Sequence, residues 1–136
     1  MSTNKTQNYA LHAWVPEDDF LLSEINENFA AIDAALAGIV TAGTYTGDGT
    51  QGRFIDLGFT PKAVLILPQD QHTSGSYYYR GGLTVTGSPL LNDSSSSARI
   101  VEGGFQVSHF FFSGGNYSTT VTCNNNGGVY HYIALQ

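Results

Sequence analysis

The feature that most constrains this 136-residue chain is a stripe of large apolar residues between positions 22 and 39. Its members recur at alternating spacings of three and four: Leu22, Ile25, Phe29, Ile32, Leu36 and Ile39. This is the a/d pattern of a coiled coil, and unbranched residues at a with Ile at d favour trimers or tetramers over dimers. We therefore predict a helix that trimerises through these six residues. The alternative is an amphipathic helix lying on the chain's own head, because three heptads do not separate the two geometries.

Signals for a helix start and a helix stop flank this stripe. Pro16 and the three acidic residues after it suit a helix start, where free N–H groups favour carboxylates. Gly38 and Gly43 mark the exit. The predicted organisation is a leading segment of residues 1–16, a helical coiled-coil stalk of residues 17–41 and a head of residues 42–136.

From Thr41 onward the composition changes to Gly, Ser, Thr, Asn and Tyr, and glycine-rich turns separate short apolar runs. Many short strands with such turns indicate a mainly β head, an antiparallel sandwich of jelly-roll-like type. The runs Ala63–Leu67 and Ile133–Leu135 are expected near its core. The expected strands are Thr44–Thr46, Arg53–Leu57, Ala63–Leu67, Ser76–Tyr79, Leu83–Thr86, Ala98–Val101, Phe105–Phe112 with Ser118–Cys123, and Val129–Leu135.

The charge argues against several partners. The formal charge is −6, residues 1–40 hold one lysine against six acids, and no basic patch is visible. Nucleic-acid binding and attraction to an anionic membrane are therefore not expected. The start lacks the apolar core of a signal peptide, no run approaches a membrane span of about 20 residues, and Cys123 is the single cysteine. These features fit assembly in a reducing cytoplasm, without membrane insertion.

Catalytic and metal-binding patterns are weak. The acids Asp56, Asp70, Asp93 and Glu102 lie in turn-rich stretches where carboxylates are commonly solvated, so a glycosidase pair is not expected. His72, His109, His131 and Cys123 show no ligand spacing such as H-x-H or C-x-x-C. The sequence predicts no enzyme, no metal and no cofactor. Three copies of one histidine meeting on a trimer axis stay an open possibility.

The opening NYALHAWVPEDDFLLSEINENFAAIDAAL resembles the N-terminal segment of tail-fibre proteins from phages and prophages of Gram-positive bacteria. Its core is Asn26, Asn28, Phe29, Ile32, Asp33, Ala35 and Leu36. The later stretches TAGTYTGDGT, IDLGFTPKAVLILP, GGLTVTG, IVEGGFQV and VYHYIAL are similar to the heads of such proteins. The resemblance therefore covers nearly the whole chain.

This resemblance implies a homotrimer of the virion tail, with an N-terminal anchor to other tail or baseplate proteins. The head then faces a glycan or protein on the host surface. Many tail fibres are several times longer, so the short stalk also fits a structural baseplate, collar or head-fibre component that binds no receptor.

Within the head, aromatic faces beside amide, hydroxyl and charged groups suit glycan recognition. The tyrosine run 77–79 and Arg80 supply rings and a forked donor, with Tyr77 and Tyr79 on one side of a strand and Tyr78 and Arg80 on the other. Packing of the tyrosines at a subunit interface and simple turn chemistry for the asparagines are the alternatives. The predicted receptor residues are Tyr77, Tyr79, Arg80, Asn92, Asp93, Asn116, Tyr117, Asn125 and Asn126.

Apolar residues are also present before the helix. Tyr9, Leu11 and Trp14 interrupt a polar segment that ends at Pro16. We predict that they attach the protein to the particle. A local hydrophobic staple over the helix start is the alternative.

Overall fold

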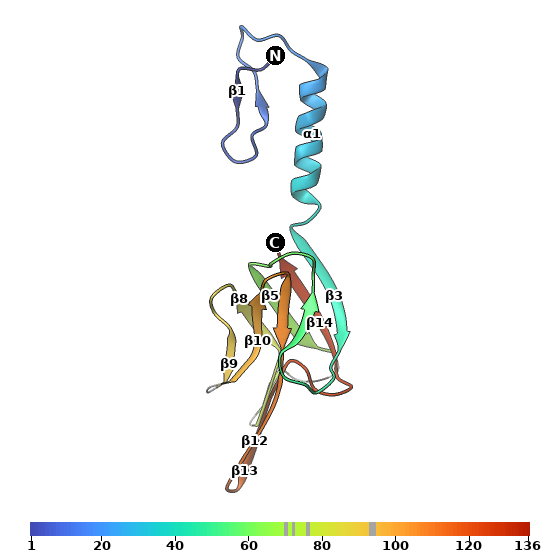
Figure 1. The fold of residues 1–136 in the computed structure, drawn as a ribbon, viewed down its shortest axis with the longest axis vertical. Helices are drawn as coiled ribbons and strands as arrows, with labels where there is room; N and C mark the ends of the chain where they lie inside the picture. The colour runs from blue at the N-terminus through green and yellow to red at the C-terminus, as the bar shows by residue number, and fades with distance from the viewer. Residues whose placement is uncertain (70, 72, 76, 93–94) are drawn as a thin grey trace. The chain divides into compact units, whose positions relative to one another are not determined.

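The computed structural model describes all residues from Met1 to Gln136 except Asp70, His72, Ser76, Asp93 and Ser94. The chain forms two compact units, residues Met1–Ile39 and residues Val40–Gln136. Strands hold 47% of the chain and helix 12%, so the predicted mainly β class is confirmed. Figure 1 shows the elements along the chain.

The N-terminal unit contains a small hairpin and one helix. Strands β1 (Asn4–Lys5) and β2 (His12–Ala13) pair antiparallel, and helix α1 spans Leu22–Leu36. The predicted helix over residues 17–41 is therefore too long. No coiled coil is evident in the described part of this single chain, and Ile39 lies beyond the helix end.

The acidic residues explain why the helix starts late. Asp18 does not cap the helix, because its carboxylate accepts hydrogen bonds from the backbone N–H groups of Thr3 and Val15, both at 3.0 Å. It thereby fixes the loop ahead of the helix. Leu21 then occupies the N-cap position in extended conformation, without a side-chain cap. At the other end, strand β3 begins at Val40, which leaves three residues after α1.

The C-terminal unit contains three four-stranded sheets. The first has the order β3 (Val40–Thr46), β14 (Val129–Leu135), β5 (Ala63–Pro68) and β8 (Gly82–Val85). The second has the order β4 (Arg53–Asp56), β11 (Gly104–Val107), β10 (Ser95–Val101) and β9 (Leu90–Asn92). The third has the order β12 (His109–Gly114), β13 (Tyr117–Thr122), β7 (Tyr78–Arg80) and β6 (Ser74–Gly75).

Several details of this topology differ from the prediction. Strands β6 and β9 were not expected, and β7 begins at Tyr78 where a strand Ser76–Tyr79 was expected. The expected strand Phe105–Phe112 is two strands, because Ser108 separates β11 of the second sheet from β12 of the third. The third sheet is not purely antiparallel, since β13 and β7 run parallel. Figure 1 shows the β12–β13 hairpin extending beyond the other strands of this unit.

The core lies between the first and second sheets. Val64, Ile66 and Ala134 point inward from the first sheet, and Phe105 and Val107 point inward from the second. Tyr45 stacks on Tyr130 with ring centroids 5.2 Å apart, and Phe105 meets Tyr132 edge-on at 5.3 Å. Such pairs stabilise a core beyond the area that they bury. The two runs expected near the core do contribute to it, through alternate residues.

Candidate functional site

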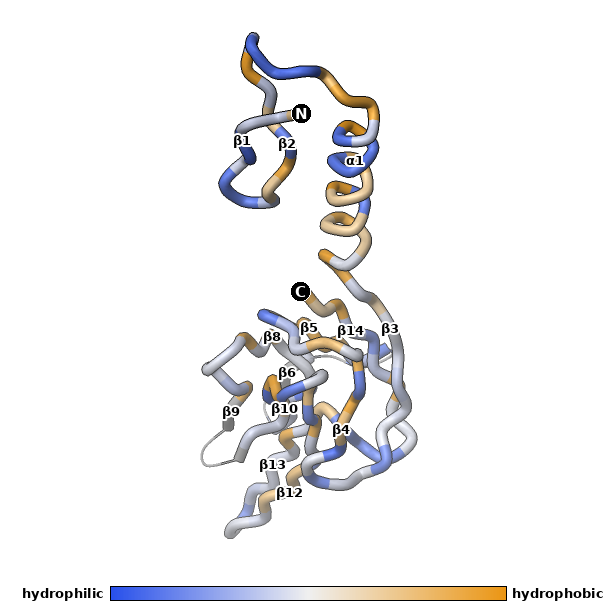
Figure 2. The backbone as a smooth tube through the Cα atoms, turned by 45° about the horizontal axis from the view of Figure 1, so that its top comes forward, coloured by the Kyte–Doolittle hydropathy of each residue, from blue (hydrophilic) through white to orange (hydrophobic). Residues whose placement is uncertain are grey.

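Most of the apolar stripe of α1 is exposed in the N-terminal unit. Leu22, Phe29 and Leu36 are 70%, 66% and 63% exposed, and Ile32 is also exposed. The single buried residue of the helix is Glu24, at 4%. Figure 2 shows hydrophilic positions in the first turns of α1 and hydrophobic positions in the later turns. A helix that buries its carboxylate and exposes its large apolar residues is typical of an element that needs a partner.

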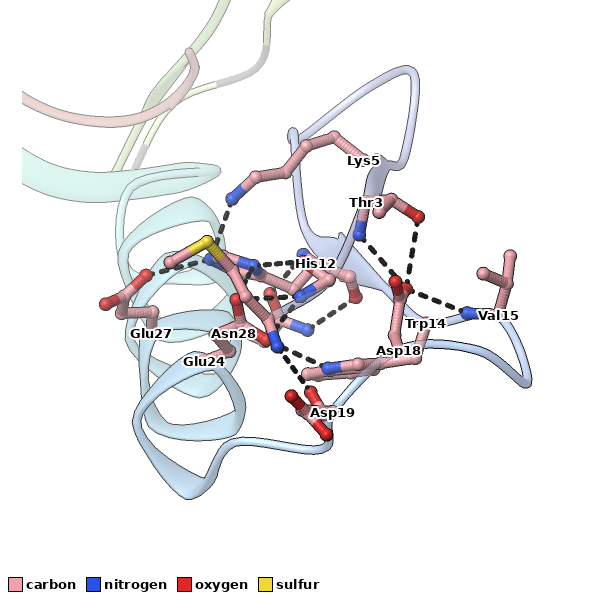
Figure 3. Close-up of polar contacts among 12 residues, drawn as sticks. Thr3, Lys5, His12, Trp14, Val15, Asp18, Asp19, Glu24, Glu27 and Asn28 are labelled. Atoms are coloured by element: carbon pink, nitrogen blue, oxygen red, sulfur yellow. Dashed lines mark hydrogen bonds and ion pairs between the residues drawn. The ribbon is translucent and has the colours of Figure 1, made fainter.

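Polar contacts hold the hairpin on the other face of α1 (Figure 3). The amide of Asn28 brackets the backbone of His12, accepting from its N–H at 2.6 Å and donating to its C=O at 2.9 Å. The His12 ring lies between two carboxylates, with Nδ1 3.3 Å from Glu24 and Nε2 2.8 Å from Glu27. Lys5 Nζ lies 2.7 Å from the same Nε2 atom. The hairpin is therefore positioned by charge and hydrogen bonds.

Glu24 is the centre of this polar network. Desolvation by itself raises the pKa of this carboxyl. The opposing effect is larger, because the Ser2 backbone N–H and Trp14 Nε1 donate to it at 2.9 Å and His12 lies alongside. The pKa of Glu24 is consequently held below its ordinary value. The ionised form is the one that this fold stabilises.

The three predicted attachment residues have different environments. Trp14 donates its indole N–H to Glu24 and packs against Phe20 with ring centroids 4.9 Å apart, so it serves the unit's own packing. Leu11 is half-buried. Tyr9 stays exposed and lines a small apolar groove of about 90 Å³ with Ile32 and Leu36. Attachment stays a prediction, and Tyr9 is its most accessible residue.

A second uncovered apolar surface lies on the head. It is the outer face of the first sheet, where side chains alternate with those of the core. Ile133 lies opposite Leu65 and then Leu83, while Leu135 lies opposite Ala63 and then Val85. The outward positions of these four strands include no Asp, Glu, Lys or Arg. We call this the aliphatic face, and its exposed large apolar members are Val40, Leu67, Leu83, Val85, Val129, Ile133 and Leu135. Thr44, Thr46 and His131 are exposed on the same face, along the β3–β14 pair.

Three of the nine predicted receptor residues come together. Tyr77 and Tyr117 stack with ring centroids 5.7 Å apart and an interplanar angle of 20°. With Asn116 they line a shallow groove of about 240 Å³, completed by Tyr78 and Ser118. These five residues are the aromatic groove. It joins the end of the β12–β13 hairpin to the start of β7 because β13 and β7 pair in parallel.

Two further predicted residues lie on β7 but do not line the groove. Tyr79 is exposed and lies opposite Val121. Arg80 places its guanidinium over the Tyr78 ring, 4.5 Å from its centroid, so this cation stabilises the strand's own aromatic residue. Asn92 is the last residue of β9, and Asp93 lies outside the described residues.

The predicted residues Asn125 and Asn126 belong to a structural turn. The Asn125 backbone N–H donates to the Tyr130 hydroxyl at 3.1 Å, and its C=O accepts from Gly128. This turn packs closely on Gly47, where an added Cβ would lie 2.1 Å from the Asn125 oxygen. These contacts support the alternative of turn chemistry for Asn125 and Asn126, and these two residues do not line the aromatic groove.

The neighbouring Asn124 belongs to the same predicted loop but not to the predicted receptor residues, and it is fully buried. Its amide donates to Asp48 Oδ1 at 2.6 Å and to the Thr50 C=O at 3.0 Å, which ties the Gly47–Gly49 turn to the 124–128 turn. The predicted receptor residues did not include Tyr78 and Ser118, because only the register of the parallel pair brings them to the groove. The aliphatic face was missed because the runs Ala63–Leu67 and Ile133–Leu135 were placed near the core without separating their inward and outward residues.

The described residues contain no cluster of three His, Cys, Asp or Glu side chains that could hold a metal ion. Burial raises the pKa of the Cys123 thiol to about 11. Its thiolate is therefore scarce at neutral pH. No helix in the described part of the chain has the length and apolar character to cross a membrane.

Comparison with protein-family models, with curated proteins and with solved structures found no match for this chain. The geometry defines a mainly β protein with two uncovered apolar surfaces and an aromatic groove.

Proposed function

We propose that this chain is a homotrimeric fibre-type protein of a bacteriophage tail that recognises a glycan on the host surface. The N-terminal unit forms a short trimeric coiled-coil stalk, and the head is a β-sandwich of jelly-roll-like type. The aromatic groove carries the proposal of recognition, because it joins Tyr77, Asn116 and Tyr117 at one exposed place. The resemblance of the sequence to tail-fibre proteins supports the origin from a phage.

The two uncovered apolar surfaces support self-association. The stripe on α1 retains its a/d spacing from Leu22 to Leu36, about 22 Å of helix at 1.5 Å per residue. The aliphatic face of the head has the same character, since it is apolar and uncharged. Exposed contiguous apolar surfaces of this kind mark protein interfaces. Three copies of the chain that share both surfaces would remove them from water in each unit.

The groove suits one sugar ring of a longer polymer. Its volume of about 240 Å³ lies below the roughly 300–1,000 Å³ of enclosed ligand pockets, so it contacts a ligand over a limited area. The C–H groups of a pyranose pack on the Tyr117 or Tyr77 ring, while the Asn116 amide and Ser118 hydroxyl serve the sugar hydroxyls. A weak single site gains strength from trimeric display on a surface that repeats the ligand.

Binding of the purified protein to Gram-positive cells and to their isolated wall polysaccharides tests this function. Tyr77→Ala and Tyr117→Ala should each remove about 1 kcal/mol, roughly fivefold, from a single-site affinity. The loss on whole cells should be larger because of avidity. Phe54→Ala is the matched control, since Phe54 is an exposed aromatic of the same head outside the groove. All variants must first show unchanged melting.

A structural role without receptor binding is the second candidate. It is favoured by Phe111 and Phe112 on the projecting hairpin, which are 62% and 38% exposed and suit contact with another protein. If the wild type binds and both tyrosine variants bind equally well, recognition lies outside the groove. No binding to any cell or polysaccharide, together with incorporation into particles, would favour the structural role.

A further inference from the structure

A polar cavity of about 400 Å³ opens on the outer side of the second sheet. It shares no residue with the aromatic groove. The core lies between this sheet and the first, so the cavity and the aliphatic face point away from each other. The cavity therefore stays open when the aliphatic face is covered. The residues that carry its chemistry are Gln51, Ser96, Arg99, Gln106, Ser108 and Phe110.

A β-bulge in β10 builds one wall of this cavity. The pairing of β10 with β9 shifts register between Ser96 and Ala98. Ser97 and Ala98 are both buried, at 3% and 1%, whereas regular alternation would turn only one of them inward. Ser96 and Arg99 consequently reach the same outer side. Bulges commonly re-aim side chains in this way beside functional sites.

Among the described residues, the guanidinium of Arg99 has one hydrogen-bond partner, which occupies its Nε–H group. Arg99 Nε donates to Gln106 Oε1 at 2.8 Å across the β10–β11 pair. The described residues provide no carboxylate within ion-pair distance of Arg99, and none lines the cavity. The remaining N–H groups can serve a ligand oxyanion in forked geometry. In a chain of net charge −6, this is a local site of positive charge.

The rest of the lining supplies hydroxyl, amide and apolar contacts. The Ser108 side chain is buried, and its Oγ accepts from the Gly52 N–H at 2.9 Å, so its own O–H can donate into the cavity. Gln51 adds an amide and Phe110 adds a ring wall. A fixed cation, neutral hydrogen-bonding groups and an apolar wall together match a sugar that carries an acidic group.

We propose that this cavity binds an anionic sugar unit, with Arg99 on its carboxylate or phosphate and Ser108 and Gln51 on its hydroxyls. Gln106 positions the guanidinium. The volume lies within the range of small-molecule sites, which suits one or two rings. Uronate-containing and phosphate-containing wall polymers share this oxyanion chemistry. The site goes beyond the aromatic groove, because it selects for charge.

Titration of the full-length protein with three small probes tests the proposal. Methyl glucuronide supplies a carboxylate, glucose 1-phosphate supplies a phosphate, and methyl glucoside is neutral. At least one anionic probe should bind at millimolar concentration in calorimetry or ligand-observed NMR, and the neutral probe should bind about tenfold more weakly or not at all. The anionic probe that binds identifies the acidic group.

Variants locate the binding site. Arg99→Gln should lower the affinity for the anionic probe about tenfold or more. Lys62→Gln removes the same charge at an exposed position outside the cavity and should leave the affinity unchanged. Tyr117→Ala should also leave it unchanged, which separates this proposal from that of the aromatic groove. Equal binding of the neutral probe, full binding by a folded Arg99→Gln variant, or no binding of either anionic probe would overturn the assignment.

Discussion

The two units of this protein solve opposite packing problems. The N-terminal unit buries a carboxylate, Glu24, and leaves its large apolar residues outside. The head buries an aromatic cluster around Tyr45, Phe105 and Tyr130 between two sheets. Because apolar burial is the main favourable term in folding, the head contains a core of its own. The N-terminal unit depends more on hydrogen bonds and on whatever covers α1.

The comparison also shows a shared property. Each unit leaves one uncharged apolar surface uncovered, the stripe on α1 in one and the aliphatic face in the other. If the chain is trimeric through both surfaces, disruption of the aliphatic face weakens assembly of the head and leaves its fold intact. Disruption of the stripe on α1 weakens assembly of the N-terminal unit and also unfolds its helix. The predictions below separate these outcomes.

The largest effect is expected from Ile133→Asp at the centre of the aliphatic face. Association would bury one carboxylate from each of three chains in apolar surroundings, which costs several kcal/mol per ion. The protein should dissociate to monomers at higher concentrations than the wild type and retain its β-sheet circular dichroism. Ile133→Thr is the control, because it keeps a β-branched residue in the strand without a charge. An Ile133→Asp trimer that dissociates on dilution no more readily than the wild type would show that this face lies outside the interface.

Ile32→Asp on α1 is the matching test of the stalk. A carboxylate in the apolar seam should dissociate the trimer and unfold the helix, because a lone helix of this length is marginal in water. Loss of helical signal and a lower mass in light scattering would be measured together. Ala34→Asp adds the same charge at an exposed position off the stripe and should keep the trimer. An unchanged mass for Ile32→Asp contradicts the stalk hypothesis.

Phe105→Ala tests whether the head core is independent of the N-terminal unit. Phe105 is fully buried against Tyr45 and Tyr132, and such truncations cost about 3–5 kcal/mol. The free energy of unfolding of the head should fall by that amount in urea. Hydrogen exchange of the Met1–Ile39 unit should stay as in the wild type. Parallel loss of protection in both units would show that they unfold together.

The sequence predicts those elements that depend on a local residue pattern. It does not predict features that depend on hydrogen bonds or strand pairing between distant residues. The strand β14 could be predicted from its alternation, and helix α1 from its a/d spacing. The late helix start could not be predicted, because the Asp18 carboxylate accepts a hydrogen bond from the backbone of Thr3, fifteen residues earlier, and does not cap the helix. Tyr77, Asn116 and Tyr117 were among the predicted receptor residues and lie together in the aromatic groove, and their role in binding stays a prediction. The polar cavity was not predicted, since the bulge between Ser96 and Ala98 is what brings Ser96 to the same side of the sheet as Arg99.

The smallest effect is expected from acid, and it should reach the two units at different pH. In the N-terminal unit, backbone hydrogen bonds from Thr3 and Val15 lower the pKa of Asp18, and the pKa of Glu24 is lowered as well. In the head, hydrogen bonds from the Thr50 hydroxyl and N–H, and then from Asn124, lower the pKa of Asp48 from 3.8 to about 2. A carboxyl with a lowered folded-state pKa stabilises the fold above its unfolded-state pKa.

That stabilisation is lost as the pH falls through the folded-state pKa, so Asp48 supports the head until the pH falls between 3.8 and about 2. The chain has one tryptophan, Trp14, whose indole binds Glu24, so its fluorescence reports the N-terminal unit alone. The N-terminal unit is held by its carboxylates and the head by an aromatic core, so we expect Trp14 fluorescence to change at higher pH than the β-sheet circular dichroism. Asp48→Asn should flatten the acid dependence of the head and leave the Trp14 transition in place. If Trp14 fluorescence and β-sheet circular dichroism change at the same pH, the N-terminal unit and the head have the same stability towards acid, which contradicts this prediction.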